Sequence, residues 1–308
     1  MKLNLIGPFI VNRPFGTEIA FAKGLRQIGV EVVEVDPNID SGLEGAHGDA
    51  DATVVFKSCV GNEERLRKIR HPIVVYQPDD ARFPHIREMM LEMRKYADLF
   101  LSFDRHSTGI AKTMGYRAAE ELLLTADPDL YSPSPEPIER DIDISFIGSL
   151  GDPVAHASRR RMIEIARAVG EKNGWNTVFG QSQDIPYVVD VYRRSKIVLN
   201  HATDVGQPFG MGFGLQCRHF EVGMTGTCLL SNSTPPSSLD EMICPTYSDE
   251  YDLAEKIEMI MTKTYSHNGE DELPLWSVYG KGLRAIICQK HMPHHRAAQL
   301  IDFIERNK

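Results

Sequence analysis

Short apolar runs alternate with amphipathic stretches along most of the chain. KLNLI, VEVVEVD and DATVVF have the length of strands, and TEIAFAKGLRQIG, between the first two, carries apolar residues at helical spacing. DLFLSF continues the series further along. Strands that alternate with helices of this length are typical of a mainly parallel, doubly wound sheet.

The alternation is interrupted once and then restarts. LYSPSPEPIERD is polar and rich in Pro and Ser, which places a linker near Ser132 to Arg140. DIDISFIGSL then begins a second series of strands and helices. We therefore predict a Rossmann-like domain at 1–135, a second at 140–288 and a C-terminal helix at 289–308 that can pack back on the first domain. Two α/β domains in tandem make the cleft between them the default ligand site.

The most informative stretch runs from Tyr192 to Ser231. It predicts a strand, a Gly-rich loop from Gly206 to Gly214, a short helix, a turn at Gly226 and the strand TCLLS. Glycines in such a loop, Gly212 and Gly214 among them, let the backbone approach a phosphate or a sugar. The N-terminus of the following helix favours an anion.

Two side chains on that helix complete the pattern. Arg218 can pair with phosphate oxygens in a planar fork, and Glu221 can accept hydrogen bonds from sugar hydroxyls. The stretch is therefore half of a predicted nucleotide-sugar pocket. Lys196 and Asn200, in the preceding strand, are further candidates for donor binding, although a surface Lys and a capping Asn explain them equally well.

Other candidates lie at strand ends and at one helix start. Arg159 and Arg160, with Arg161, begin a helix, where cations oppose the helix dipole unless an anion is near; a solvated face is the simpler explanation. For an acceptor-side base or holding group we favour Asp79 and Asp80, which follow PIVVYQP, over Asp104, which follows DLFLSF. Each of these carboxylates could instead be a helix cap.

Composition and charge narrow the function. The 308-residue chain has a net charge of −9, which disfavours generic binding to a nucleic-acid backbone. Five scattered cysteines without CxxC spacing indicate reduced thiols in a cytoplasmic protein. The apolar runs are too short to span a bilayer. His291, His294 and His295 lack a metal-site spacing and are expected at a solvent-facing helix start.

Several strings together resemble a known family. SKIVLN, RHFEVGMTGTCLLS and HHRAAQLIDFI, in this order, are similar to group 1 glycosyltransferases of the CgeB-like, spore-maturation type. The resemblance covers about residues 140–305 and implies the GT-B fold, in which two Rossmann-like doubly wound domains face each other across a cleft. It also implies an acceptor-side N-terminal domain and a donor-binding C-terminal domain.

The resemblance assigns roles residue by residue. Glu221 falls where the family holds the donor ribose, Arg218 falls in its R-x-F-E pattern, and Gly148 and Ser149 fall in the first loop of the donor domain. Many relatives carry a second Glu eight residues before the ribose-binding one, and Phe213 stands there in this chain. The resemblance implies no bound metal and no cofactor besides the nucleotide sugar itself as substrate.

The expected activity is transfer of a hexose or pentose from a nucleotide sugar to a hydroxyl group. The acceptor stays open among a glycan, a protein, a metabolite and a modified nucleobase, as do the sugar, the nucleotide, the stereochemical course and the oligomeric state. Two alternatives fit the same two-domain shape. One is a nucleotide-sugar epimerase, and the other is a non-catalytic protein that binds nucleotide sugars.

Overall fold

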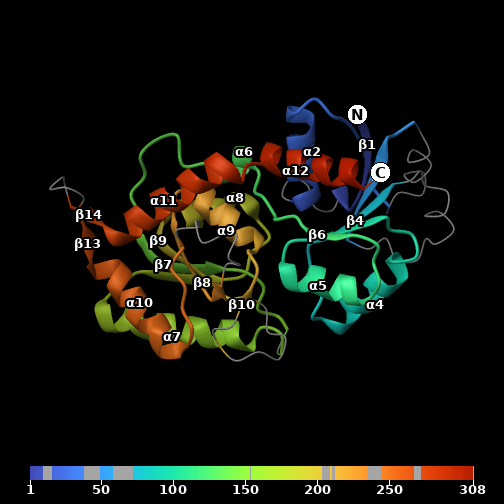
Figure 1. Ribbon diagram of the computed structural model, residues 1–308. Helices are drawn as coiled ribbons and strands as arrows, with labels where there is room; N and C mark the ends of the chain where they lie inside the picture. Colours follow the sequence, from blue (N-terminus) through green and yellow to red (C-terminus); the bar gives the residue numbers. More distant parts are fainter. Residues whose placement is uncertain are drawn as a thin grey trace. The chain divides into compact units, whose positions relative to one another are not determined.

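The computed structural model describes residues 1–9, 16–37, 49–57, 72–152, 154–202, 209, 212–234, 244–266 and 272–307, with only the backbone described for Phe213, Ser233 and Thr234. The chain divides into two compact units. Met1–Asp127 and His291–Lys308 form the first unit, and Pro128–Lys290 forms the second (Figure 1). The chain thus leaves the first unit and returns to it at its C-terminal end.

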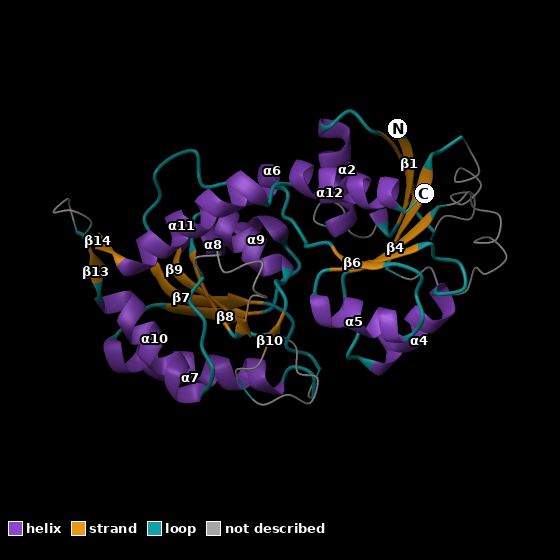
Figure 2. Ribbon diagram, viewed as in Figure 1, coloured by secondary structure: helices purple, strands orange, loops and turns teal. Residues whose placement is uncertain are grey.

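The first unit is built on a parallel sheet of six strands in the order β2-β1-β3-β4-β5-β6. The strands are β1 (Lys2–Ile6), β2 (Glu31–Val35), β3 (Ala52–Phe56), β4 (Ile73–Gln77), β5 (Leu99–Ser102) and β6 (Ala119–Glu121). Its helices are α2 (Thr17–Gln27), α4 (Pro84–Met93), α5 (Arg105–Thr113) and α12 (Pro293–Arg306). Figure 2 shows α4 and α5 on one side of this sheet and α2 and α12 on the other.

The central strands of this sheet are mostly apolar and are buried because helices cover both faces. Every residue of β3, β4 and β5 is buried, as expected for strands of a doubly wound sheet. On the face that α2 and α12 cover, α12 approaches α2 closely at Gly24, where an added Cβ would lie 2.3 Å from the Pro293 carbonyl oxygen. The glycine allows this approach because it has no side chain.

The second unit has a parallel sheet of four strands in the order β11-β9-β7-β8. Its strands are β7 (Ile142–Ile147), β8 (Thr177–Gly180), β9 (Ser195–Asn200) and β11 (Cys228–Ser231), with small pairs formed by β10 (Gly212–Phe213) and β12 (Ser233–Thr234) and by β13 (Thr264–Tyr265) and β14 (Leu273–Pro274). Its helices are α6 (Pro128–Tyr131), α7 (Ala157–Asn173), α8 (Ile185–Arg194), α9 (Cys217–Met224), α10 (Glu250–Thr262) and α11 (Leu275–Lys290). Figure 2 shows α7 and α10 on one side of the sheet and α8, α9 and α11 on the other.

The two predicted parallel α/β sheets are confirmed, and so are the helix at Arg218 and the strand after Gly226. Helix α11 was not predicted. The segment NEERLRKIR, residues 62–70, whose sequence predicts a charged helix, lies outside the described residues. None of the helices that the structure describes combines the length and the apolar character needed to cross a membrane.

Candidate functional site

The carboxyl ends of β7, β9 and β11 lie at the same edge of the second sheet because all three strands are parallel. This edge holds Asn200 and Ser231, which are in register, and the loop that begins at Gly148. The Asn200 amide donates to the Ser231 hydroxyl at 2.9 Å. The Tyr247 hydroxyl donates to the Asn200 carbonyl at 3.0 Å. Ligands of open α/β sheets bind at this edge, so we take it as the candidate site.

Arg218 connects the elements around this edge. From the first turn of α9, its guanidinium donates to the Ile147 carbonyl at 2.8 Å and to the Asn200 side-chain oxygen at 2.9 Å. It also donates to the Tyr192 hydroxyl at 3.3 Å and lies 4.8 Å from the centre of the Phe146 ring. Arg218 therefore holds β7, β9 and α8 together and places a positive charge at their shared edge.

Gly148 lies against the Arg218 guanidinium. A Cβ at this position would lie 2.6 Å from Nη2 of Arg218 and 2.9 Å from the Phe146 ring. The Arg218 guanidinium therefore occupies the space that a side chain at this position would need.

Glu221 lies three residues after Arg218 on α9, so the two side chains share one face of the helix. Its side chain is partly exposed and has the Tyr131 hydroxyl as a hydrogen-bond partner. Burial raises the pKa of Glu221, while the charge of Arg218 and the Tyr131 hydroxyl act in the opposite direction. This carboxylate, partly exposed and next to the Tyr131 hydroxyl and the charge of Arg218, can accept hydrogen bonds from vicinal hydroxyls of a ligand.

The arginines at the start of α7 shape the loop after β7. Arg159 is buried and donates to the carbonyls of Ser149, at 3.1 Å, and His201, at 2.9 Å. Arg160 donates to the Leu150 carbonyl at 3.0 Å. Arg161 instead makes exposed ion pairs with Glu164 and Glu250, so the solvated-face explanation holds for this residue.

The Gly-rich loop lies mostly outside the described residues. Of its two named glycines, Gly212 donates its N–H to the Asn232 carbonyl at 3.1 Å. A Cβ on Gly212 would lie 2.9 Å from the Asn232 side-chain oxygen. Gly214 has φ +70°, a left-handed conformation that glycine adopts readily. Both glycines therefore meet local packing or backbone demands next to β11.

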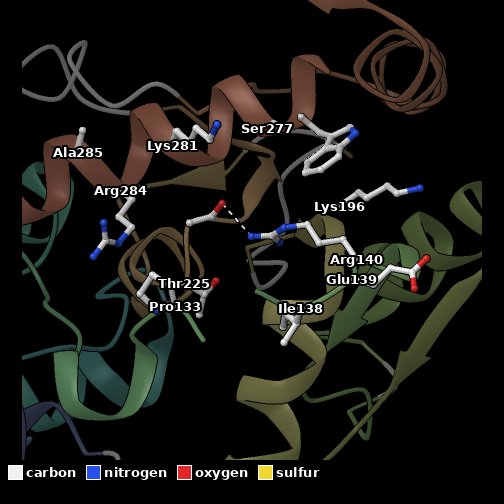
Figure 3. A pocket seen from close by; sticks show the side chains of 12 residues that line it. Pro133, Ile138, Glu139, Arg140, Lys196, Thr225, Ser277, Lys281, Arg284 and Ala285 are labelled. Carbon is white, nitrogen blue, oxygen red and sulfur yellow. Dashed lines mark hydrogen bonds between the residues drawn. The ribbon is translucent and has the colours of Figure 1, made fainter. Parts of the chain in front are cut away.

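Lys196 is not brought to this cluster. It lies at the amino end of β9 and pairs with Asp143, with Nζ 2.6 Å from the carboxylate oxygen. Its side chain lines a separate pocket at the opposite edge of the sheet (Figure 3). Asn200, at the other end of the same strand, is the only one of the two that reaches the Arg218 network.

In the first unit, the three acidic candidates have different surroundings. Asp80 is held by Arg82, whose Nε lies 2.8 Å from a carboxylate oxygen. Asp79 is 45% exposed on its side chain and lies 3.8 Å from Lys57. Asp104 is 4% exposed and caps α5, accepting the Ser107 N–H at 2.8 Å. The cap interpretation is thus confirmed for Asp104.

Asp104 has a further property that a cap does not require. Its second carboxylate oxygen is buried and has no hydrogen-bond partner among the described residues. Burial raises the pKa of Asp104, against the effect of the hydrogen bonds from Ser107. A carboxyl group with a raised pKa and an uncommitted oxygen is suited to proton transfer.

Further polar residues lie near Asp104 and near the Arg218 cluster, and the sequence did not identify them. Gln77, Ser102 and Glu121 end adjacent strands in register, beside Asp104. Burial raises the pKa of Glu121, which pairs with Arg105 at 3.0 Å. The strand ends were the signal available for these residues. Tyr131 and Tyr192, which meet Glu221 and Arg218, carried no such signal.

The three C-terminal histidines do not converge on one point. A ring nitrogen of His291 pairs with Arg296, and Nδ1 of His295 accepts the Met292 N–H at 3.2 Å. His291 is buried, so the expected solvent-facing position is wrong for this residue. Across the part of the chain that the structure describes, no group of three or more His, Cys, Asp or Glu side chains is arranged to hold a metal ion.

Comparisons with known proteins point to one family and one fold. The model of a family described as glycosyl transferase-like matches residues 149–302, half of the chain. A comparison with curated proteins gives no match. Many solved structures match, and the three described next are 10–14% identical to this chain.

Three of these structures illustrate the likeness. An α-glucosyltransferase in complex with UDP and a 13-mer DNA containing a HMU base has a TM-score of 0.66 and 14% identity, with 99% of each chain covered. The E. coli trehalose-6-phosphate structure bound with UDP-2-fluoro glucose has a TM-score of 0.65 and 10% identity, again with 99% of each chain covered. A putative UDP-N-acetylglucosamine 2-epimerase from Listeria monocytogenes has a TM-score of 0.55 and 10% identity, with 99% of this chain and 95% of that chain covered. At these identities the likeness establishes the fold, and the expected GT-B fold class is confirmed.

Proposed function

The chain belongs to the glycosyl transferase-like family, and on that premise we propose that it transfers a sugar from a nucleotide-sugar donor to an acceptor hydroxyl without a bound metal ion. One observation carries the proposal. Glu221, Arg218 and the loop after β7 meet at the carboxyl edge of the second sheet, where a carboxylate, a cation and backbone N–H groups lie together.

Each part of this edge has a task in donor binding. Glu221 accepts hydrogen bonds from the ribose hydroxyls, and Tyr131 keeps the carboxylate oriented. The N-terminal turn of α9 and the backbone at Ser149 receive the diphosphate, as helix N-termini and tight loops do for anions. Gly148 contributes by leaving room for the Arg218 guanidinium, because its own N–H is bound to the Gly180 carbonyl at 3.0 Å. Arg218 adds positive charge under this loop, which stabilises the diphosphate as it leaves.

On the acceptor side we propose Asp104 as the group that receives the hydroxyl proton in an inverting reaction. Its pKa is raised by burial and one of its oxygens is uncommitted among the described residues. Asp80 is paired with Arg82, and the Asp79 side chain is 45% exposed, so they fit better as groups that hold the acceptor. The ranking therefore reverses the sequence-based preference for Asp80 and Asp79.

Donor binding is tested first, because it does not require the acceptor. The purified protein is screened by thermal shift against UDP, GDP, ADP, CDP and their common sugar conjugates. A nucleotide that binds only the folded state raises the melting temperature by mass action. We expect one nucleotide series to respond, and the matching sugar conjugate to be hydrolysed slowly in the absence of an acceptor.

Glu221→Gln is the decisive variant, and Glu171→Gln is its control, since Glu171 is an exposed glutamate of the same unit. Loss of charge-assisted hydrogen bonds to two hydroxyls should weaken donor binding about 10- to 100-fold. The control should bind as the wild type does. Unchanged donor binding in Glu221→Gln, or no response to any nucleotide, would contradict the proposal.

The reaction itself is tested with EDTA present, against hydroxyl-bearing glycans, proteins, metabolites and modified nucleobases. Transfer that persists in EDTA supports metal independence. Formation of an epimeric sugar in the absence of any acceptor would identify the protein as an epimerase instead. Tight donor binding without turnover across the whole panel would identify it as a non-catalytic binding protein.

A further inference from the structure

A second pocket lies at the amino edge of the second sheet, opposite to the edge that holds Glu221. It has a volume of about 690 Å³, which is within the size range of small-molecule sites. Its lining comes from the segment before β7, the start of β9, the turn after α9 and one face of α11 (Figure 3). Neither donor binding nor proton transfer, as proposed above, uses this pocket.

The floor of the pocket is fixed by Arg140. Its guanidinium donates to the Gly226 carbonyl at 3.1 Å and to the Thr227 hydroxyl at 2.6 Å, and it also pairs with the Ser195 carbonyl. It lies 5.8 Å from the centre of the Trp276 ring, a cation–π distance. Arg140 therefore brings a positive charge and an indole together in a rigid arrangement.

The wall of the pocket carries cations whose charge is not balanced locally. Ser277, Lys281 and Arg284 are spaced by four and three residues, so they lie along one face of α11. The side chains of Lys281 and Arg284 make no ion pair or hydrogen bond within the part of the chain that the structure describes. The Cδ of Arg284 lies 3.6 Å from the position of a Cβ on Gly226, which places its side chain against the floor.

The charge of the pocket contrasts with that of the whole chain. Four cationic side chains, Arg140, Lys196, Lys281 and Arg284, line it against one acidic side chain, Glu139. Lys196 is paired with Asp143. Figure 3 shows Glu139 on the side of Lys196, pointing away from Lys281 and Arg284. In a protein with a net charge of −9, this local excess of positive charge indicates an anionic ligand.

We infer that this pocket binds a small molecule carrying two linked phosphate groups. Lys281 and Arg284, one helical turn apart, face the phosphate oxygens, and Arg140 supports them from the floor. One phosphate group would leave part of this charge unmatched, whereas a diphosphate offers oxygens to both α11 cations. The Ser277 hydroxyl, on the same helix face, can donate to a further oxygen.

Inorganic pyrophosphate is the test ligand, and Trp276 is the reporter. The chain has two tryptophans, so Trp175→Phe leaves Trp276 as the only indole. Titration of this variant with pyrophosphate should change the Trp276 fluorescence in a saturable way, and orthophosphate should bind more weakly. Because the reporter lines this pocket, the signal does not depend on whether the Glu221 site binds a donor.

Added to Trp175→Phe, the pair Lys281→Gln and Arg284→Gln should raise the Kd for pyrophosphate about tenfold or more, because two charge-assisted contacts are lost. The pair Lys281→Arg and Arg284→Lys keeps the charge and should bind nearly as the parent does. Arg167→Gln with Lys263→Gln removes the same two residue types from exposed positions of the same unit outside the pocket, and should have little effect. The absence of a saturable signal, or equal affinity in the first pair and the parent, would overturn the inference.

Discussion

Replacing Arg218 by Met tests whether one side chain holds the carboxyl edge of the second sheet together. Met has similar length and keeps the contact with the Phe146 ring, but it removes every N–H donor. The Ile147 carbonyl and the Asn200 side-chain oxygen, 2.8 and 2.9 Å from the guanidinium, would then lose this donor. Both residues are buried, at 3% and 0% exposure, so water replaces the lost donor poorly.

The expected loss of stability follows from these two contacts. A buried acceptor left without its donor costs about 1–3 kcal/mol, so Arg218→Met should lower the free energy of unfolding of the second unit by about 3 kcal/mol. For a unit of this size, that corresponds to a fall in Tm of about 6–12 °C. Arg218→Lys supplies a single ammonium nitrogen in place of a planar fork and should recover less than half of the loss.

Urea unfolding followed by tryptophan fluorescence measures this effect selectively, because both tryptophans, Trp175 and Trp276, belong to the second unit. A midpoint for Arg218→Met equal to that of the wild type would refute the reasoning. So would full recovery in Arg218→Lys, since it would show that charge alone, without the forked geometry, is enough.

Three further predictions concern pH, packing and proton transfer. Burial lowers the pKa of His219 to about 4. The buried neutral form therefore stabilises the fold fully above pH 6.5, and this contribution, about 3 kcal/mol, is lost as the pH falls from 6.5 to 4. Urea midpoints of His219→Leu should fall less over this range than those of the wild type. Gly24→Ala should destabilise the first unit by about 1–3 kcal/mol, because its Cβ would overlap the Pro293 carbonyl. Gly109→Ala, in open space within a helix, should instead stabilise this unit by up to about 1 kcal/mol. Thermal melts followed by circular dichroism measure both effects, and equal melting temperatures would contradict the packing argument. Asp104→Asn keeps the helix cap and should retain the melting temperature while reducing transfer about 10²- to 10⁴-fold, and normal transfer would exclude Asp104 as the base.

The sequence was most informative where the local pattern and the site coincide. An apolar strand, a short helix and a glycine turn define α9 and its neighbours, and the three-residue spacing of Arg218 and Glu221 places both on one helix face. Such features depend on residues close in the chain, so the sequence alone can predict them.

Features that depend on tertiary contacts could not be predicted from the sequence. Tyr131 lies in a Pro- and Ser-rich stretch that predicts a linker, yet α6 packs against α9 and brings its hydroxyl to Glu221. Lys196 and Asn200 seemed equivalent because they flank the same apolar run. A strand rises about 3.3 Å per residue, so four residues place them about 13 Å apart, at opposite edges of the sheet.

Two glycines explain why helix α11 was not predicted from the sequence. Gly280 and Gly282 lower the helix propensity of the segment, and their presence argues against a helix of 16 residues. In the structure, a Cβ on Gly280 would lie 2.3 Å from the Gly226 carbonyl oxygen, so the residue is needed for close packing of α11 on the turn after α9. The tertiary contact that favours glycine here thus weakens the local signal for the helix.

Helix α9 joins the carboxyl edge of the second sheet to the pocket at its amino edge. It carries Arg218 and Glu221 on one face, and the turn that follows it, with Thr225 and Gly226, lines the pocket. Eight residues of helix span only about 12 Å, and close packing transmits a displacement of such an element with little loss. Lys281→Gln with Arg284→Gln changes the exposed face of α11 and leaves every Arg218 contact in place. A change in donor affinity on addition of pyrophosphate that is present in the parent and absent in this pair would therefore show that the two sites are coupled, and α9 with its turn carries residues of both.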